Sequence, residues 1–397
     1  MAGGETIPVN PALVEWARRE SGYDRERVAR RLQVKEERFA AWETGDRQPT
    51  FRQVQQLAAF FRRPLSVFFL PRPPQLAPLA AEYRRLPGLQ PGHESPELRL
   101  ALRQMLGRRE NALNLMGELG ESVPKFSLLA HLRESPAEVG VRMREATGID
   151  PLAQLDWTDE WRAWAAWRTA IEGLGVLVFQ FPKVALEEVR GLALLRMPLP
   201  VIAINGKEIV GAKGYTVFHE LAHLMLAAGN EEKPALREDR SATEWEKVER
   251  FAEIAASHAL VPDATLSTVV GNLGLRNAAW DIQDVRKLAK AFRITPLAMA
   301  TRLRESDYMS WTRYNQWRAD WEAYVSTLPK RRGGFASPVE KAVSRAGRPF
   351  TQLVLEALSS NRLTAVDAAR YLDLRFEHFE NLRAHVSRGP SEGTSDE

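Results

Sequence analysis

The sequence contains no cysteine among its 397 residues. This absence excludes disulfide bonds and thiolate metal ligands, so a bound zinc ion would have to be held by histidine and carboxylate side chains. No uninterrupted apolar run approaches the roughly 20 residues that a membrane-spanning helix needs. The N-terminus also lacks a basic segment followed by an apolar one, which is the pattern of a secretory signal. We therefore expect a cytoplasmic protein without a membrane partner.

The sequence also lacks a large excess of charge of either sign. Its 55 basic and 51 acidic side chains leave a formal net charge of +4, so the total charge does not by itself indicate nucleic-acid binding. With 44% hydrophobic and 27% charged residues, the composition is typical of a folded globular protein. A chain of this length is too long for one ordinary hydrophobic core, and we expect two or three domains.

Residues 10–70 have the pattern of a compact helical domain. Asp24 is a suitable N-cap for a helix over 25–32, whose apolar residues lie on one stripe. A short turn separates this helix from a second one over 35–42, and a further helix begins near Phe51. Two short helices joined by a turn of three or four residues form a helix-turn-helix motif.

This region resembles the Xre (lambda-repressor-like) family of helix-turn-helix domains. The matching residues are Ala29, the corner Trp42-Glu43-x-Gly45, Pro49-Thr50, the run Leu57-Ala58 and the closing Phe68-Phe69-x-Pro71. The resemblance implies a domain over residues 1–72 that binds double-stranded DNA. Five basic side chains are available for phosphate contacts: Arg25, Arg30, Arg31, Lys35 and Arg38. Because Glu36 and Glu37 would repel phosphates at the start of the recognition helix, a protein-recognition or homodimerisation module is the alternative.

The rest of the chain reads as a mainly helical protein with a small β-sheet (α+β). We expect a proline-rich linker over 73–93, followed by a large domain over 94–329 that begins with helices. A further linker over 330–334 then leads to a helical domain over 335–388 and a disordered tail over 389–397. Four tryptophans at positions 157, 161, 164 and 167 have helical spacing, and we interpret them as one core-facing stripe. Apolar runs at 176–179, 192–195 and 200–205 predict three short strands.

A helix over 210–228 carries the most informative motif, His219-Glu220-Leu221-Ala222-His223. Histidines at positions i and i+4 project from one face of a helix, which is the geometry that two imidazoles need to bind one Zn²⁺. Glu220 follows the first histidine and could take a proton from a water that the metal activates, as a general base. Tyr215, one turn earlier, is a candidate donor to an oxyanion. The pattern predicts one catalytic zinc per chain, although two histidines and a carboxylate also accept other divalent ions.

A third protein ligand has to come from another part of the sequence. In peptidases of the gluzincin type, which the motif resembles, a downstream glutamate binds the metal, and a residue four positions later supports a ligand histidine. Glu249 fits the first role and Glu253 the second, on a helix over 242–260. If that helix is rotated, Glu244 or Glu246 would replace Glu249. His258 lies on the opposite side of the same helix, and we interpret it as structural.

Residues 170–305 resemble the ImmA/IrrE family of metallopeptidases. The resemblance rests on Ile204-Asn205, the helix "YTVFHELAHLML" and the segment "VERFAEIAASHALVP", in which Glu253 and Ala255 replace the usual asparagine and phenylalanine. It implies a zincin-like, gluzincin-type fold and a peptidase of bacteria or phages that regulates transcription by cleaving a DNA-binding repressor. The alternative is a DNA-binding regulator or scaffold whose peptidase-like domain senses a signal without cutting.

Overall fold

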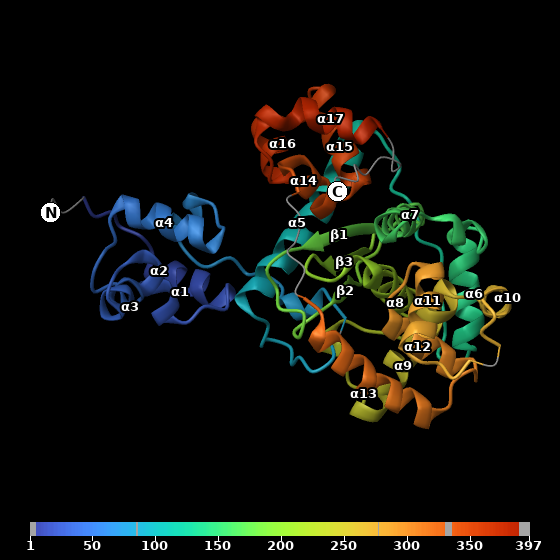
Figure 1. The fold of residues 1–397 in the computed structure, drawn as a ribbon. Coiled ribbons are helices and arrows are strands. Elements are labelled where there is room, and N and C mark those ends of the chain that lie inside the picture. Colours follow the sequence, from blue (N-terminus) through green and yellow to red (C-terminus); the bar gives the residue numbers. More distant parts are fainter. Residues whose placement is uncertain (1–4, 85, 277, 330–335, 389–397) are drawn as a thin grey trace. The chain divides into compact units, whose positions relative to one another are not determined.

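In a computed structural model, the described residues are 5–84, 86–276, 278–329 and 336–388 (Figure 1). The chain divides into two compact units, of which unit 1 comprises Met1–Ala81 and Gly88–Gln104, and unit 2 comprises Glu82–Pro87 and Met105–Glu397. The predicted linker at 330–334 and the predicted tail at 389–397 lie outside the described residues. Among the described residues, no helix has both the length and the apolar character needed to cross a membrane.

Unit 1 contains the predicted helix-turn-helix. Its elements are α1 (Pro11–Glu20), α2 (Arg25–Leu32), α3 (Glu36–Thr44), α4 (Phe51–Phe61) and the 3-10 helices η1 (Leu65–Phe69) and η2 (Leu79–Ala81). The Asp24 side chain caps α2 by accepting a hydrogen bond from the Arg27 amide at 2.6 Å, which satisfies a backbone donor that the first turn leaves free. Gln33 ends α2 in the left-handed conformation and so turns the chain into α3.

The core of unit 1 consists of the apolar stripes of these helices. Its buried residues include Val14, Ala17, Val28, Ala29, Phe39, Trp42, Val54, Leu57, Phe61 and Phe68. A buried carboxylate also holds the unit together, because Glu43 of α3 pairs with Arg18 and Arg25, each at 2.6 Å. The Trp42-Glu43-x-Gly45 corner therefore supplies both a core aromatic ring and the acceptor for two arginines.

A long helix, α5 (Pro96–Leu119), contributes residues up to Gln104 to unit 1 and the remainder to unit 2. The other elements of unit 2 are α6 (Pro136–Ala146), η3 (Ala153–Asp156), α7 (Glu160–Glu172), β1 (Leu177–Phe181), β2 (Gly191–Leu194), β3 (Val201–Asn205), α8 (Val210–Ala228), η4 (Ala235–Arg237), α9 (Ala242–Leu260), α10 (Asp263–Asn272), α11 (Ile282–Phe292), α12 (Pro296–Glu305), α13 (Trp311–Thr327), α14 (Pro338–Ala346), α15 (Arg348–Ser359), α16 (Ala365–Leu372), η5 (Phe376–His378) and α17 (Phe379–Ser387). The chain is therefore mainly helical with a small sheet, as predicted.

The three predicted strands form one mixed sheet in the order β1-β3-β2. β3 runs parallel to β1 and antiparallel to β2, with Ala203 opposite both Phe179 and Leu192. Every residue of the three strands is buried, which explains why the runs are continuously apolar rather than alternating. Helix α8 packs against β2 and β3, and α7 and α14 pack against β1 (Figure 1).

Small residues allow the helices around α8 to pack closely. Helix α9 lies against both α8 and α6, and it turns buried alanines toward them: Ala252, Ala255, Ala256 and Ala259. At Gly140 of α6, a Cβ atom would lie only 2.5 Å from the Ala255 carbonyl oxygen, so α6 tolerates no side chain there.

The tryptophan stripe is only partly as predicted. Asp159 caps α7, which begins at Glu160, so Trp157 precedes the helix and cannot share its face. Trp161 is 66% exposed, whereas Trp164 and Trp167 are buried. The interpretation as a core-facing stripe is therefore wrong for Trp161 and correct for Trp164 and Trp167. Trp157 lies outside the helix but packs against the core as predicted, edge-on against Trp167 at 4.9 Å.

Candidate metal centre

Helix α8 holds the two histidines of the motif close together. It spans Val210–Ala228 as predicted and is capped by Gly229. The Nε2 atoms of His219 and His223 are 3.1 Å apart, because four residues of an α-helix return a side chain to nearly the same face. His223 is completely buried, and 14% of the His219 side chain is accessible. The pair therefore lies at the edge of the core with one side open.

Glu249 of α9 completes a group of three candidate ligands. Its Oε2 atom is 3.4 Å from Nε2 of His219, and its Oε1 atom is 3.3 Å from Nε2 of His223. Four ligands placed tetrahedrally at about 2.0–2.1 Å from zinc would lie roughly 3.3–3.4 Å from one another. The spacing and chemistry of the three side chains therefore fit a zinc ion with an open fourth position.

The other candidate residues of α9 do not lie beside the two motif histidines. Glu244 is tied to the helix terminus, where its side chain accepts from the Ser241 amide at 3.0 Å, and Glu246 is exposed. His258 is buried, with its Nδ1 atom 3.0 Å from the Ile254 carbonyl oxygen. The structure thus brings Glu249, rather than Glu244 or Glu246, to the two motif histidines.

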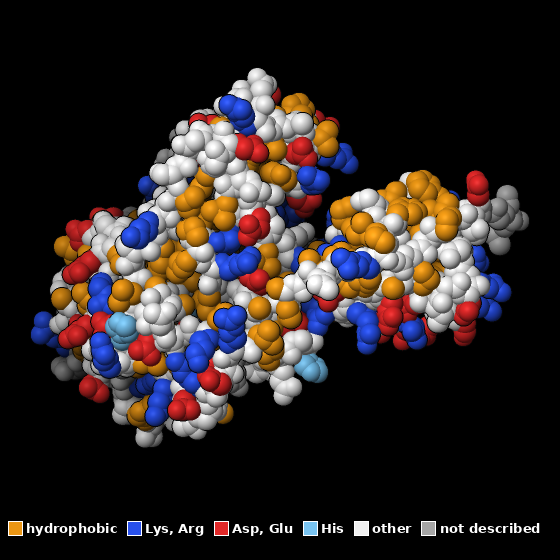
Figure 2. Space-filling view, turned by 180° about the vertical axis from the view of Figure 1, so that it is seen from behind, with side chains coloured by type: hydrophobic (Ala, Val, Ile, Leu, Met, Phe, Trp, Pro, Cys, Tyr) orange, Lys and Arg blue, Asp and Glu red, His pale blue; other side chains and the backbone are white. Residues whose placement is uncertain are grey.

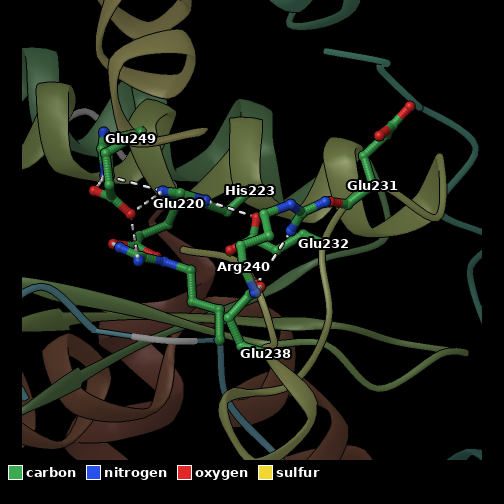
Figure 3. A network of polar contacts seen from close by, with 9 residues as sticks. Glu220, His223, Glu231, Glu232, Glu238, Arg240 and Glu249 are labelled. Carbon is green, nitrogen blue, oxygen red and sulfur yellow. Dashed lines mark hydrogen bonds and ion pairs between the residues drawn. The ribbon is translucent and has the colours of Figure 1, made fainter. Parts of the chain in front are cut away.

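Glu232 contacts the outer nitrogen of His223. The carboxylate oxygen Oε2 lies 2.7 Å from Nδ1 of His223, and both side chains are buried (Figure 3). Burial raises the pKa of Glu232 to about 8. A carboxylate at this position fixes the tautomer and the ring orientation of a metal-binding histidine. Sequence reasoning did not identify Glu232, because it lies in a polar loop beside Glu231 and no spacing distinguishes the two.

The loop after α8 is itself held by charged groups. Arg240 pairs with Glu238 at 3.1 Å and also donates to the backbone carbonyl of Glu231 (Figure 3). Only 1% of the Glu238 side chain is accessible. The contact of Arg240 with the Glu231 carbonyl fixes the backbone next to Glu232. The Glu232 carboxylate is therefore held by its backbone and by its contact with His223.

The supporting role predicted for Glu253 stays a prediction. Its side chain is exposed, and among the described residues it makes no hydrogen bond with an imidazole. Glu253 lies one helical turn after Glu249 on α9, near Tyr215. The Tyr215 hydroxyl is 3.5 Å from the Glu253 carbonyl oxygen. The residue that supports His223 is therefore Glu232. Tyr215 stacks on His219 with ring centroids 6.3 Å apart, and its role toward an oxyanion stays a prediction.

Arg84 enters the centre from the segment that was predicted to be a linker. Its Nε and Nη2 atoms lie 2.9 and 3.0 Å from the two carboxylate oxygens of Glu220, and its Nη1 atom lies 2.9 Å from Oε1 of Glu249. Only 2% of the Arg84 side chain is accessible. Burial alone would raise the pKa of Glu220, but the charge and hydrogen bonds of Arg84 outweigh burial and lower it. Nothing in the proline-rich sequence around Arg84 signals this contact.

Two family models match the chain. Residues 171–304 match the Peptidase_M78 model, described as an IrrE N-terminal-like domain, and residues 14–68 match a model described as Helix-turn-helix. The first match includes α8, α9 and all three candidate ligands. Residues 171–304 form an IrrE N-terminal-like domain. A search of curated proteins found no relative of the chain.

The IrrE-like domain thus follows an Xre-type helix-turn-helix domain in the same chain. Of the basic residues proposed to contact DNA, Arg25 pairs with buried Glu43, and Arg30 pairs with Glu26. The other three, Arg31, Lys35 and Arg38, are exposed and make no ion pair within the described part of the chain. On the face of unit 1 drawn in Figure 2, acidic side chains lie among the basic ones. Of the five predicted residues, the three without an ion pair therefore lie at the end of α2 and the start of α3.

Proposed function

We propose that the chain is a zinc-dependent endopeptidase that acts in transcriptional regulation. The observation that carries this proposal is the group of His219, His223 and Glu249, whose ligand atoms lie within 4.8 Å of one another. Glu220 is next to the first ligand but is not a member of that group. Metal-assisted hydrolysis of a peptide bond requires such a set of three ligands with a further carboxylate beside them that is not a ligand.

The residues around the group have distinct parts in the reaction. Zinc, when bound by His219, His223 and Glu249, supplies a positive charge that polarises a peptide carbonyl and makes a water molecule easier to deprotonate. Glu220 accepts the proton of the attacking water as a general base and delivers it to the departing amine nitrogen. Glu232 holds the His223 ring by its Nδ1 atom, and one side of His219 stays open for the substrate.

The proposed substrate is a DNA-binding repressor that is cut at one or a few positions. A peptidase domain acts on a protein, and the helix-turn-helix domain of the same chain would bring it to DNA at which repressors are also bound. Colocalisation by a linked binding module raises the effective concentration of one partner for the other. Cleavage of the repressor would then release the genes that it controls.

The test compares cells that express the wild-type chain with cells that express Glu220→Gln at the same level. New protein N-termini that appear only with the wild type identify the substrate and the cleaved bond. We expect one or a few such termini, within a DNA-binding protein, which purified wild-type protein then produces from the purified substrate. Identical N-termini in both cell lines, with identical transcripts, would contradict the proposal.

One observation favours a second function. Arg84 occupies both carboxylate oxygens of Glu220, and an arginine that never left this position would keep the general base from reaching a water molecule. The chain would then be a DNA-binding regulator with a peptidase-like sensor that does not cut. In that case Glu220→Gln would leave gene regulation intact.

A further inference from the structure

Residues 82–84 lie along the outer edge of β2 in the IrrE-like domain, where they form isolated β-bridges rather than a full strand. The Arg84 amide donates to the Ala193 carbonyl oxygen at 3.2 Å, and the Leu195 amide donates to the Glu82 carbonyl oxygen at 3.2 Å. Tyr83 faces Leu194 of β2 in an antiparallel bridge. We call residues 82–84 the edge segment.

Further contacts hold the edge segment on its other side. The Ala235 amide donates to the Tyr83 carbonyl oxygen at 2.8 Å, and the Tyr83 side chain is 1% exposed. Glu82 pairs with Arg196 at 2.9 Å. The edge segment therefore lies between β2 and the loop that carries Glu232.

This edge is the one along which an extended peptide would reach the catalytic residues. One side of β2 pairs with β3, so a peptide could add to β2 only at the side that the edge segment holds. A Cβ atom placed on Gly191 of β2 would lie 3.0 Å from Cγ of Glu220, which shows how closely β2 passes the proposed general base. A peptide on this edge would thus have its backbone beside Glu220.

The charge of Arg84 has a direct consequence for metal binding. Its guanidinium group pairs with both buried Glu220 and partly buried Glu249, two carboxylates that would repel each other without a cation between them. A divalent ion on His219, His223 and Glu249 would supply that positive charge instead. A buried cation beside the same carboxylates disfavours the ion through like-charge repulsion.

We propose that the edge segment is an internal plug, in which Arg84 takes the place of the metal's charge and residues 82–84 take the place of the substrate strand. Binding of zinc weakens the ion pairs of Arg84 with Glu220 and Glu249. The peptide substrate then replaces the edge segment along β2. This inference rests on the proposed metallopeptidase function. It makes the arrangement in which Arg84 contacts Glu220 and Glu249 a closed state and requires an open state for cleavage.

The first test measures zinc affinity by competition with a chromophoric chelator, in full-length wild type, Arg84→Gln and the matched control Arg72→Gln. Arg72 is exposed in the same proline-rich region. We expect Arg84→Gln to bind zinc at least about tenfold more tightly than the wild type, because a neighbouring positive charge is removed, and Arg72→Gln to match the wild type. Equal affinity in all three proteins would overturn the plug while leaving the metallopeptidase intact. If none of the three binds zinc, the proposed function fails and the plug with it.

A second measurement needs no variant and therefore does not depend on whether Arg84→Gln folds. Hydrogen exchange is followed at the Leu195 and Ala235 amides, which donate to the edge segment. We expect exchange at both amides to speed up when zinc is added to the wild-type protein, while amides within β3 stay protected. Unchanged or slower exchange at Leu195 and Ala235 in zinc-loaded protein would overturn the proposal.

Discussion

Oε2 of Glu232 lies 2.7 Å from Nδ1 of His223, and neither side chain is accessible to more than 1%. The contact turns the Nε2 atom of His223 toward Glu249 and His219. His223 is the most deeply buried of the three candidate ligands, and Glu232 is the side chain that contacts its Nδ1 atom. The position of the metal centre therefore depends on a residue outside the motif.

We predict that Glu232→Gln weakens zinc binding by roughly 10–100-fold, as expected when the carboxylate behind a ligand histidine is lost. The matched control is Glu231→Gln, because Glu231 is partly exposed and contacts His131 instead. Chelator competition gives both affinities. Equal weakening of zinc binding by the two substitutions would mean that the loop as a whole, rather than the Glu232 carboxylate, determines the zinc affinity.

Glu220→Gln separates catalysis from metal binding. We predict that it lowers the rate of substrate cleavage by about 10²–10⁴-fold, the usual contribution of a positioned general base, while zinc content stays at the wild-type level. The amide has nearly the same size as the carboxylate but cannot accept the proton of the attacking water. Loss of zinc from Glu220→Gln would instead indicate that Glu220 is a ligand.

Gly191 is a position where any side chain should damage the site. A Cβ atom there would overlap Cγ2 of Thr216 and crowd Glu220, so we predict that Gly191→Ala lowers the free energy of unfolding by about 1–3 kcal/mol and reduces cleavage. Gly117 of α5 offers the control, because nothing lies near its added Cβ. Gly117→Ala should raise stability by about 0.5–1 kcal/mol through helix propensity. Urea unfolding followed by circular dichroism measures both, and a Gly191→Ala protein as stable as the wild type would refute the predicted overlap.

Zinc binding should depend on pH through His219. Burial would lower the pKa of this histidine, but the hydrogen bond and charge of Glu249 outweigh burial and raise it above 6.5. In the metal-free protein the charged pair therefore stabilises the fold fully below the unfolded value of 6.5, and this contribution is lost as pH rises through the folded value. Zinc binds only neutral imidazole. At pH values below the folded pKa of His219, the affinity of the protein for zinc should therefore increase about tenfold for each unit by which pH rises. Chelator competition over about pH 6–8 checks this, and an affinity that is flat near the lower end would contradict it.

The helix-turn-helix domain allows a prediction about DNA. Arg31 and Arg38 are exposed and make no ion pair within the described ranges, so we predict that Arg31→Ala and Arg38→Ala each weaken binding to duplex DNA and lower the salt slope by about 1. Arg25→Ala should instead lower stability, because Arg25 pairs with buried Glu43. Fluorescence anisotropy at two salt concentrations distinguishes these effects. Unchanged binding in both variants would favour a protein-recognition or homodimerisation module.

Local signals in the sequence predicted much of this fold. The caps at Asp24 and Gly229 and the long apolar run of α8 gave helix boundaries that match the structure. The ligand pair His219 and His223 follows helical spacing, which local sequence records directly, whereas Glu249 lies on α9 and was predicted from the resemblance to gluzincin-type peptidases. The boundaries proposed for the domains stay a prediction.

Contacts between segments that are distant in sequence were not predictable in the same way. Arg84 reaches Glu220 across 136 residues, and no composition or periodicity encodes which sheet edge a proline-rich segment joins. Sequence reasoning placed the supporting residue on the helix of Glu249 and did not consider Glu232, whose carboxylate lies 2.7 Å from Nδ1 of His223. Pairings of this kind depend on tertiary packing.

Zinc content tests the central claim most directly. Elemental mass spectrometry is applied to purified wild type, His219→Ala and Glu249→Gln, beside the controls His93→Ala and Glu246→Gln, whose native side chains are exposed. We predict about one zinc per chain in the wild type and both controls, and little in His219→Ala and Glu249→Gln. A wild type that holds no zinc after reconstitution, or a His219→Ala protein that holds as much as the wild type, would contradict the metal centre.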